Sequence, residues 1–171
     1  MLFALDCYSY IVPNRNMLEG IFLRNRSVVF VIRNKKILME KLCYEGRTFY
    51  SIPGGGIEEG ETPEQTAIRE LKEECGLDGT IVKKLVEVYS NGRTEYAFEV
   101  SVPENQNPIK GYDPEEPIDN QPIKEVLWME LSEMPEKERA FMWRYGLLEI
   151  EGFFDEVISW GNEISYPQKN R

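Results

Sequence analysis

The sequence predicts an α/β fold, and three observations lead to this prediction. Short segments rich in β-branched and aromatic residues recur between turn-forming residues, which is typical of strands. One segment near the middle has both the start and the stop signals of a helix. Beyond residue 135 the apolar residues follow helical spacing. The 171 residues suit roughly one domain, so we expect a single domain over residues 1–164 and a frayed polar tail over 165–171.

Six strands are expected along the chain. They are residues 27–32, 37–42, 48–52, 81–90, 94–102 and 124–129. The first two form a hairpin around the turn-like residues 33–36, and Asn91-Gly92 joins the fourth to the fifth. After the third strand come Pro53 and three glycines, where we expect no regular element to continue.

The helix signal is strongest over residues 62–75. Thr62 is a candidate N-cap, Pro63 takes the first helical position, and Gln65 completes a capping box. Gly76 is the expected C-terminal stop. Residues 103–122 contain five of the ten prolines and form a long loop, a length that is uncommon unless the loop has a function or is disordered. Further helices are expected over about 135–161.

Composition excludes several classes of function. The formal net charge is −10, which argues against broad binding to nucleic acid polymers, although a nucleotide held through a divalent cation remains compatible. The chain has no histidine and only three cysteines, which excludes His-based triads and Cys/His zinc sites. We find neither a signal peptide nor an apolar run long enough to span a membrane, so we expect a cytoplasmic protein with no membrane partner.

Three carboxylates on the expected helix suggest metal chemistry. At about 100° per residue, Glu70, Glu73 and Glu74 project within an arc of roughly 100°, beside the apolar stripe that contains Leu71. Such a density of carboxylate oxygens suits Mg²⁺ or Mn²⁺. Three successive glycines upstream allow the backbone to approach the same cation. The alternative is an ordinary solvated helix face after a plain turn.

The spacing of these features separates the two interpretations. Gly55 is followed after five residues by Glu61, and after seven more by the run Arg69-Glu70-Leu71-Lys72-Glu73-Glu74-Cys75-Gly76-Leu77. Residues 55–77 together resemble the Nudix box, G-x5-E-x7-R-E-U-x-E-E-x-G-U with U aliphatic, at every fixed position. The likeness to the Nudix hydrolase family covers about residues 25–135. It implies an α/β/α sandwich with a mixed sheet, here with extra C-terminal helices.

The resemblance also implies roles for single residues. The family binds Mg²⁺ or Mn²⁺ and hydrolyses a nucleoside diphosphate linked to another group X. By position in the box, Glu73 and Glu74 would bind metal, Glu70 would act as ligand or base, and Arg69 would orient a catalytic glutamate. Gly55 or Gly56 would lend a backbone carbonyl to the metal. Glu61 would pair with the helix or with Arg69.

Residues outside the box are less determined. Several members of the family take an extra carboxylate from a later loop, for which Glu115 or Glu116 is the candidate, with Glu95 and Glu99 behind them; a solvated loop is the alternative. Candidate substrate-binding residues, which could equally be surface or core residues, are Lys41, Arg47 and Tyr50.

The box indicates the reaction but not the group X. The secondary signatures of the NADH and ADP-ribose branches are missing after the box, and the CoA-type pattern is missing before the glycines. About sixteen residues after the box, Arg93 occupies the position of the proline of the ADP-ribose branch. The default is a pyrophosphohydrolase of (d)NTPs or modified nucleotides. ADP-ribose, nucleotide sugars and dinucleoside polyphosphates are alternatives, and so is a nucleotide sensor without activity. The aromatic residues after residue 140 either pack on the sheet or form a homodimer surface.

Overall fold

A mixed sheet of seven strands forms the centre of the computed structural model, which describes residues 24–159 except 91 and 115. The strands are β1 (Arg26–Arg33), β2 (Lys36–Tyr44), β3 (Arg47–Ser51), β4 (Gly54–Gly56), β5 (Thr80–Ser90), β6 (Arg93–Ser101) and β7 (Ile123–Glu130). The main order is β3-β2-β1-β6-β5, with β4 paired to β1 and β7 paired to β2. Strand β1 is parallel to β6 and antiparallel to β2 and β4, so the sheet is mixed as expected.

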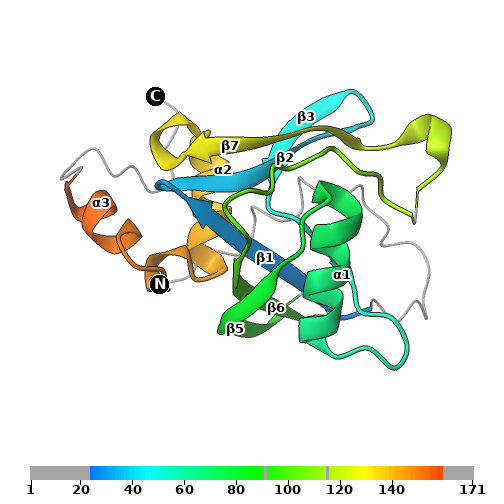
Figure 1. Ribbon diagram of the computed structural model, residues 1–171, viewed down its shortest axis with the longest axis horizontal. Helices are drawn as coiled ribbons and strands as arrows, with labels where there is room; N and C mark the ends of the chain where they lie inside the picture. The colour runs from blue at the N-terminus through cyan, green and yellow to red at the C-terminus, as the bar shows by residue number, and fades with distance from the viewer. Residues whose placement is uncertain (1–23, 91, 115, 160–171) are drawn as a thin grey trace.

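Helices cover both faces of this sheet (Figure 1). They are α1 (Pro63–Cys75), α2 (Glu136–Arg144) and α3 (Phe153–Ser159), with short 3₁₀ turns at Ile118–Asn120, Leu131–Glu133 and Leu147–Glu149. Side chains alternate along β1: Val28 and Phe30 pack with α2 and α3, whereas Val29 and Val31 pack with α1. The two cores make the molecule an α/β/α sandwich, the fold class that the sequence predicts.

One expectation about the glycine run is wrong. Residues Gly54–Gly56 do continue as a regular element, because β4 pairs with the start of β1 over Arg26–Val28. Gly54 has φ +149°, and a Cβ there would lie 2.2 Å from the Ser27 carbonyl oxygen. Only glycine therefore permits this close approach, which fixes the backbone leading into α1.

The C-terminal aromatic residues pack mainly on the sheet. Phe153 is buried, and Phe141 and Trp143 pack against the core on the α2 side. Phe154 is 56% exposed, and Trp160, the expected tail and the Asn91 half of the predicted turn lie outside the described residues. Over residues 24–159, leaving out 91 and 115, no helix is both long enough and apolar enough to cross a membrane.

Candidate active site

Helix α1 begins and ends as its sequence predicts. The Thr62 side chain accepts from the Gln65 amide at 3.2 Å, and the Gln65 side chain accepts from the Thr62 amide at 2.8 Å. Gly76 ends the helix in the left-handed region with φ 69°. Leu71 and Cys75 of the capped helix face the sheet, and Glu70 and Glu74 border the glycine strand.

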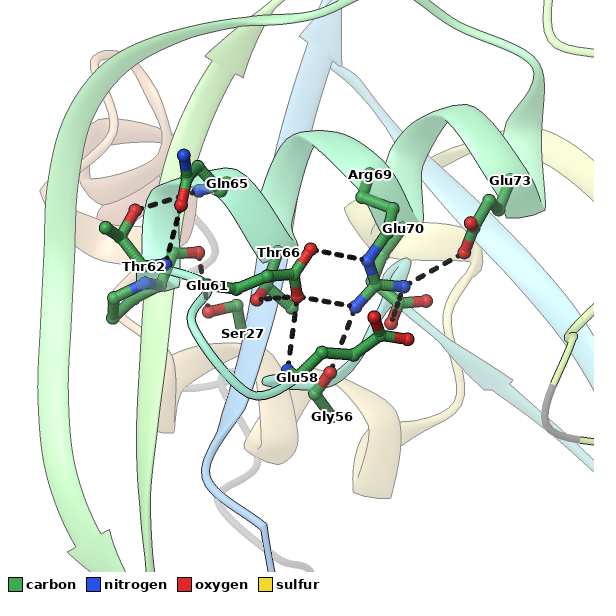
Figure 2. A network of polar contacts seen from close by, with 11 residues as sticks. Ser27, Gly56, Glu58, Glu61, Thr62, Gln65, Thr66, Arg69, Glu70 and Glu73 are labelled. Atoms are coloured by element: carbon green, nitrogen blue, oxygen red, sulfur yellow. Dashed lines mark hydrogen bonds and ion pairs between the residues drawn. The ribbon is translucent and has the colours of Figure 1, made fainter.

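Arg69 connects the acidic residues of the motif (Figure 2). Its guanidinium donates to both carboxylate oxygens of Glu61 at 2.8 and 3.0 Å, a bidentate pair. It also donates to Glu70 at 2.8 Å, to Glu73 at 3.0 Å and to the Gly56 carbonyl at 3.1 Å. The hydrogen bond from Arg69 lowers the pKa of Glu61 to about 2. The arginine thus joins the helix to the glycine strand and fixes three motif carboxylates.

Glu70 and Glu74 are buried beside the glycine strand. Burial raises the pKa of Glu70 from 4.5 to about 7 despite the opposing charge of Arg69. A Cβ on Gly55 would lie 2.2 Å from a Glu70 carboxylate oxygen, so the glycine leaves the space that this side chain fills. Glu74 accepts from the Gly54 amide at 2.8 Å, and burial together with the charge of Glu40 raises its pKa well above the ordinary value.

Glu40 belongs to this group, although the motif does not include it. It lies on β2, is 2% exposed, and contacts the Cys75 thiol at 3.7 Å. Burial raises its pKa to about 7, with the adjacent Glu74 side chain opposing the shift. An acid inside the apolar run Ile37–Leu42 is the sequence signal that could have revealed it.

Arg26 is a second residue that the motif does not reveal. It starts β1 and donates to the Gly54 carbonyl. Its charge lowers the pKa of the buried acids Glu40, Glu70 and Glu74, so it offsets part of their mutual repulsion. The excess of basic residues before the glycines is the only sequence signal for it.

The donor chemistry of this cluster fits a hard divalent cation. Among the described residues, no group of three or more Cys, Asp or Glu side chains is arranged to hold a metal ion. Arg69 donates hydrogen bonds to Glu70 and Glu73, and the Gly54 amide donates to Glu74. All the available donors are carboxylate or carbonyl oxygens, the ligands that Mg²⁺ and Mn²⁺ prefer. The buried acids repel one another, and a cation would relieve this repulsion.

The long loop brings one of its two candidate acids near the site. The Tyr44 hydroxyl donates to Glu116 at 3.5 Å, and burial followed by the charge of Glu116 raises the pKa of Tyr44 to about 12. The same loop lies against the end of α1, because the Gly111 and Tyr112 amides donate to the Glu74 and Glu73 carbonyls at 2.8 and 3.3 Å. Glu115 lies outside the described residues.

Glu95 and Glu99, the further candidates for the extra carboxylate, pair with residues outside the acidic cluster. Buried Glu95 accepts from Tyr145 and pairs with Arg93 at 2.7 Å, whereas Glu99 pairs with Lys83 at 3.6 Å. These partners of the two carboxylates all lie outside the Nudix-like motif.

The three candidate substrate-binding residues lie on β2 and β3, where Lys41 directly follows the buried Glu40. Lys41 and Tyr50 are cross-strand partners on β2 and β3, and Tyr50 is half-buried against the core on the α2 side. Lys41 forms an exposed ion pair with Glu125 at 3.9 Å. Arg47 is exposed at the start of β3, opposite Tyr44. Among the described residues, none of the three contacts a motif carboxylate through an ion pair.

Proteins of similar sequence match this chain over different shares of its length. The RNA pyrophosphohydrolase of Hydrogenovibrio crunogenus is 28% identical over 149 residues, which cover 84% of this chain and 80% of the relative. The ADP-ribose pyrophosphatase of Bacillus subtilis is 39% identical over 67 residues, or 38% of this chain and 36% of that one. Relatives in Mycobacterium tuberculosis and Schizosaccharomyces pombe are matched over only 40% and 42% of their own length.

Solved structures share the fold. A NUDIX hydrolase from Nitrosomonas europaea aligns over 77% of this chain and 70% of its own, with a TM-score of 0.58 and 20% identity. A NUDIX-family hydrolase from Clostridium perfringens aligns over 75% of this chain and 99% of its own, with a TM-score of 0.56 and 16% identity. Residues 22–149 match the family described as NUDIX domain. On this match and on the complete motif from Gly55 on β4 to Leu77 after α1, the chain belongs to the Nudix hydrolase family.

Proposed function

We propose that the protein is a divalent-metal-dependent pyrophosphohydrolase that cleaves a nucleoside diphosphate linked to X. One observation carries this proposal: Arg69 fixes Glu61, Glu70 and Glu73 beside the glycine strand, while Glu74 is held by Gly54. Buried carboxylates are energetically unfavourable without a partner charge. Their grouping here is explained most simply by a bound cation.

The proposed cation ligands are the carboxylates of Glu70, Glu73 and Glu74 and the carbonyl of Gly55. When bound, Mg²⁺ or Mn²⁺ would neutralise phosphate oxygens and acidify a water molecule. Arg69 keeps the carboxylate of Glu73, whose side chain is 32% exposed, directed along the same side of α1 as Glu70. The chain thereby presents oxygen donors from the helix and from the glycine strand to one region.

A carboxylate must accept a proton from the attacking water, since the chain has no histidine. Glu70 is the first candidate, as the alternative to its role as a cation ligand, because a pKa of about 7 for the uncoordinated carboxyl suits a general base near neutral pH. Glu116 is the second candidate, since its loop lies against the end of α1. Glu115, the neighbouring loop acid, stays a proposal from the sequence.

The substrate class is proposed from chemistry and from relatives. A (d)NTP or a modified nucleotide is the default, with ADP-ribose, nucleotide sugars and dinucleoside polyphosphates as alternatives. A triphosphorylated RNA end enters the comparison because the relative that covers 84% of this chain is named RNA pyrophosphohydrolase. Against an RNA substrate stands the net charge of −10, which disfavours a polymer.

Lys41 and Tyr50 are proposed to contact the nucleoside, with Arg47 farther along β3. Tyr50 is on β3, the strand that leads into the glycine strand β4. A ring against the core can contribute a stacking face. A cytoplasmic location and a homodimer through the C-terminal aromatic residues also remain proposals.

A substrate panel tests this function. Release of phosphate, pyrophosphate or nucleoside monophosphate is measured for ordinary and oxidised dNTPs, ADP-ribose, sugar nucleotides, dinucleoside polyphosphates and a 5′-triphosphorylated oligoribonucleotide, with Mg²⁺, with Mn²⁺ and with EDTA. We expect metal-dependent turnover of one class. Nucleotide binding by thermal shift without any turnover would instead favour the sensor.

A further inference from the structure

The last turn of α1 is completed by the long loop. The final carbonyls of a helix have no partner within the helix. Here each one accepts a backbone amide: Lys72 from Gly76 at 3.0 Å, Cys75 from Ile109 at 2.9 Å, Glu74 from Gly111 at 2.8 Å and Glu73 from Tyr112 at 3.3 Å. Residues 109–112, which we call the strap, supply three of these donors although they lie more than thirty residues downstream.

Gly111 is required for this arrangement. A Cβ on Gly111 would lie 1.8 Å from the Glu73 carbonyl oxygen and 3.0 Å from the Glu74 carbonyl carbon. These atoms belong to the helix backbone, so no side-chain rotation can relieve the clash. A larger residue at this position must move either the strap or the last turn of α1.

Glu74 is consequently held at both ends. The Gly111 amide donates to its carbonyl at 2.8 Å, and the Gly54 amide donates to its carboxylate at 2.8 Å. The amides of the strap also face the negative end of the helix dipole, where Glu73 and Glu74 place further negative charge. The strap thus fixes the backbone from which two proposed metal ligands project.

We propose that Gly111 is a positioning residue, and that the strap sets the cation affinity of the active site by holding the backbone of Glu73 and Glu74. This inference rests on the proposed function, because it takes these two glutamates as ligands. The strap continues directly into Asp113 and Glu116, and the Asp113 amide is held by Gln121 at 2.6 Å. The Glu116 amide donates to the Asp113 carbonyl at 3.2 Å, so Glu116 is bonded to the residue that follows the strap.

The test compares Gly111→Ala with Gly152→Ala. Gly152 has φ +89°, and a Cβ added there would meet no atom within 4 Å, so its substitution introduces backbone strain far from the site. Binding of Mn²⁺ in the absence of substrate is followed by electron paramagnetic resonance. We expect affinity to fall by about tenfold or more in Gly111→Ala, as for other residues that support metal ligands, and to stay unchanged in Gly152→Ala.

Kinetics add a readout that general loss of structure would not produce. In Gly111→Ala the Mg²⁺ concentration for half-maximal activity should rise, and excess Mg²⁺ should restore most of kcat. Equal Mn²⁺ affinity in the wild type and in folded Gly111→Ala would overturn the proposed role of the strap and leave the proposed metal site intact. No Mn²⁺ binding by the wild type would overturn the proposed metal site, and with it the role of the strap.

Hydrogen exchange of the wild type decides the matter if Gly111→Ala does not fold. If closing the strap and binding the cation favour each other, Mg²⁺ must slow exchange of the Gly111 amide. The Ile150 amide, which donates to Leu147 far from the site, is the control and should not respond. Exchange at Gly111 that ignores Mg²⁺ would contradict the proposal.

Discussion

Charge balance around Arg69 sets the properties of the individual site residues. This guanidinium lies among Glu61, Glu70 and Glu73, and Glu40 and Glu74 are buried nearby, where the charge of Arg26 lowers their pKa values. Burial outweighs the attraction of the arginines at Glu70 and Glu40, whose pKa values both rise to about 7. The buried acids of the free protein therefore repel one another, as the proposed cation site requires.

The first prediction concerns pH and stability. Glu40 and Glu70 titrate at 4.5 in the unfolded chain and at about 7 in the folded protein, so the folded state binds more protons between these values. Their contribution to stability is complete below pH 4.5 and is lost as the pH rises through 7. We expect the Tm of the metal-free protein to be lower at pH 8 than at pH 5.5.

Two comparisons check this prediction by calorimetry. Glu40→Gln should reduce the loss of Tm between the two pH values, and Mg²⁺ should raise Tm more at pH 8. Glu130→Gln, at an exposed ion pair with Lys36, is the matched control and should behave as the wild type. A Tm that rises from pH 5.5 to pH 8 in all three proteins would contradict the assignment.

The second prediction concerns Arg69→Lys. A lysine ammonium cannot reproduce the bidentate pair with Glu61 while also reaching Glu73 and the Gly56 carbonyl. We expect kcat/KM at fixed Mg²⁺ to fall by about 10–100-fold. Arg33→Lys, at the opposite end of β1, controls for the substitution, and unchanged kcat/KM in Arg69→Lys would refute the role of the guanidinium fork.

Among the elements, α1 depends most on its own sequence. Its capping box supplies two amides with acceptors, and its Gly76 stop is local as well. The C-terminal end of α1 differs, because backbone amides of the strap, a segment distant in sequence, donate hydrogen bonds to its last carbonyls. Local signals thus determine where α1 begins and ends, and tertiary contacts determine how firmly its last turn is held.

A third prediction follows for the cap. Thr62→Ala removes the acceptor for the Gln65 amide and should lower the free energy of unfolding by about 1 kcal/mol, measured by urea denaturation. Because Thr62 bonds to Gln65 and to none of the proposed cation ligands, kcat at saturating Mg²⁺ should change less than twofold, roughly the effect of a surface substitution. Thr62→Ser, which keeps the hydroxyl, should retain the wild-type stability.

These elements also show what a sequence can predict. The long strands and α1 follow from alternation, caps and turns, which are local properties of the chain. Strand β4 could not be predicted, because a run of glycines forms a strand only through its pairing with β1. The roles of Glu40 and Gly111 depend on contacts with α1 across the fold, which no motif encodes.

At the scale of the whole molecule, a buried polar network joins α2 to the sheet. Glu95 on β6 is 1% exposed and accepts from the Tyr145 hydroxyl, with Arg93 and Arg144 beside it. Tyr145 also packs against Phe141, with ring centroids 4.7 Å apart. The outer helical layer is therefore fixed to the sheet by one charge-assisted network as well as by apolar packing.

The fourth prediction tests this attachment. Tyr145→Phe keeps the ring packing but removes a hydrogen-bond donor from a buried carboxylate, which should lower the free energy of unfolding by about 1–3 kcal/mol. Tyr112→Phe, at a side chain 52% exposed, is the control and should change stability little. Equal urea midpoints for Tyr145→Phe and the wild type would show that the network does not stabilise the sandwich.

The most direct test of the central claim is turnover of the best substrate as a function of Mg²⁺ in the wild type and in Glu73→Gln, with folding checked by circular dichroism. The Glu73 side chain is 32% exposed, more than the 20% of Glu61, so its substitution should spare the fold while removing a proposed metal ligand. We expect Mg²⁺-dependent turnover in the wild type and a loss of about 100-fold or more in the variant. Near-normal turnover of Glu73→Gln at saturating Mg²⁺ would contradict the account of the site.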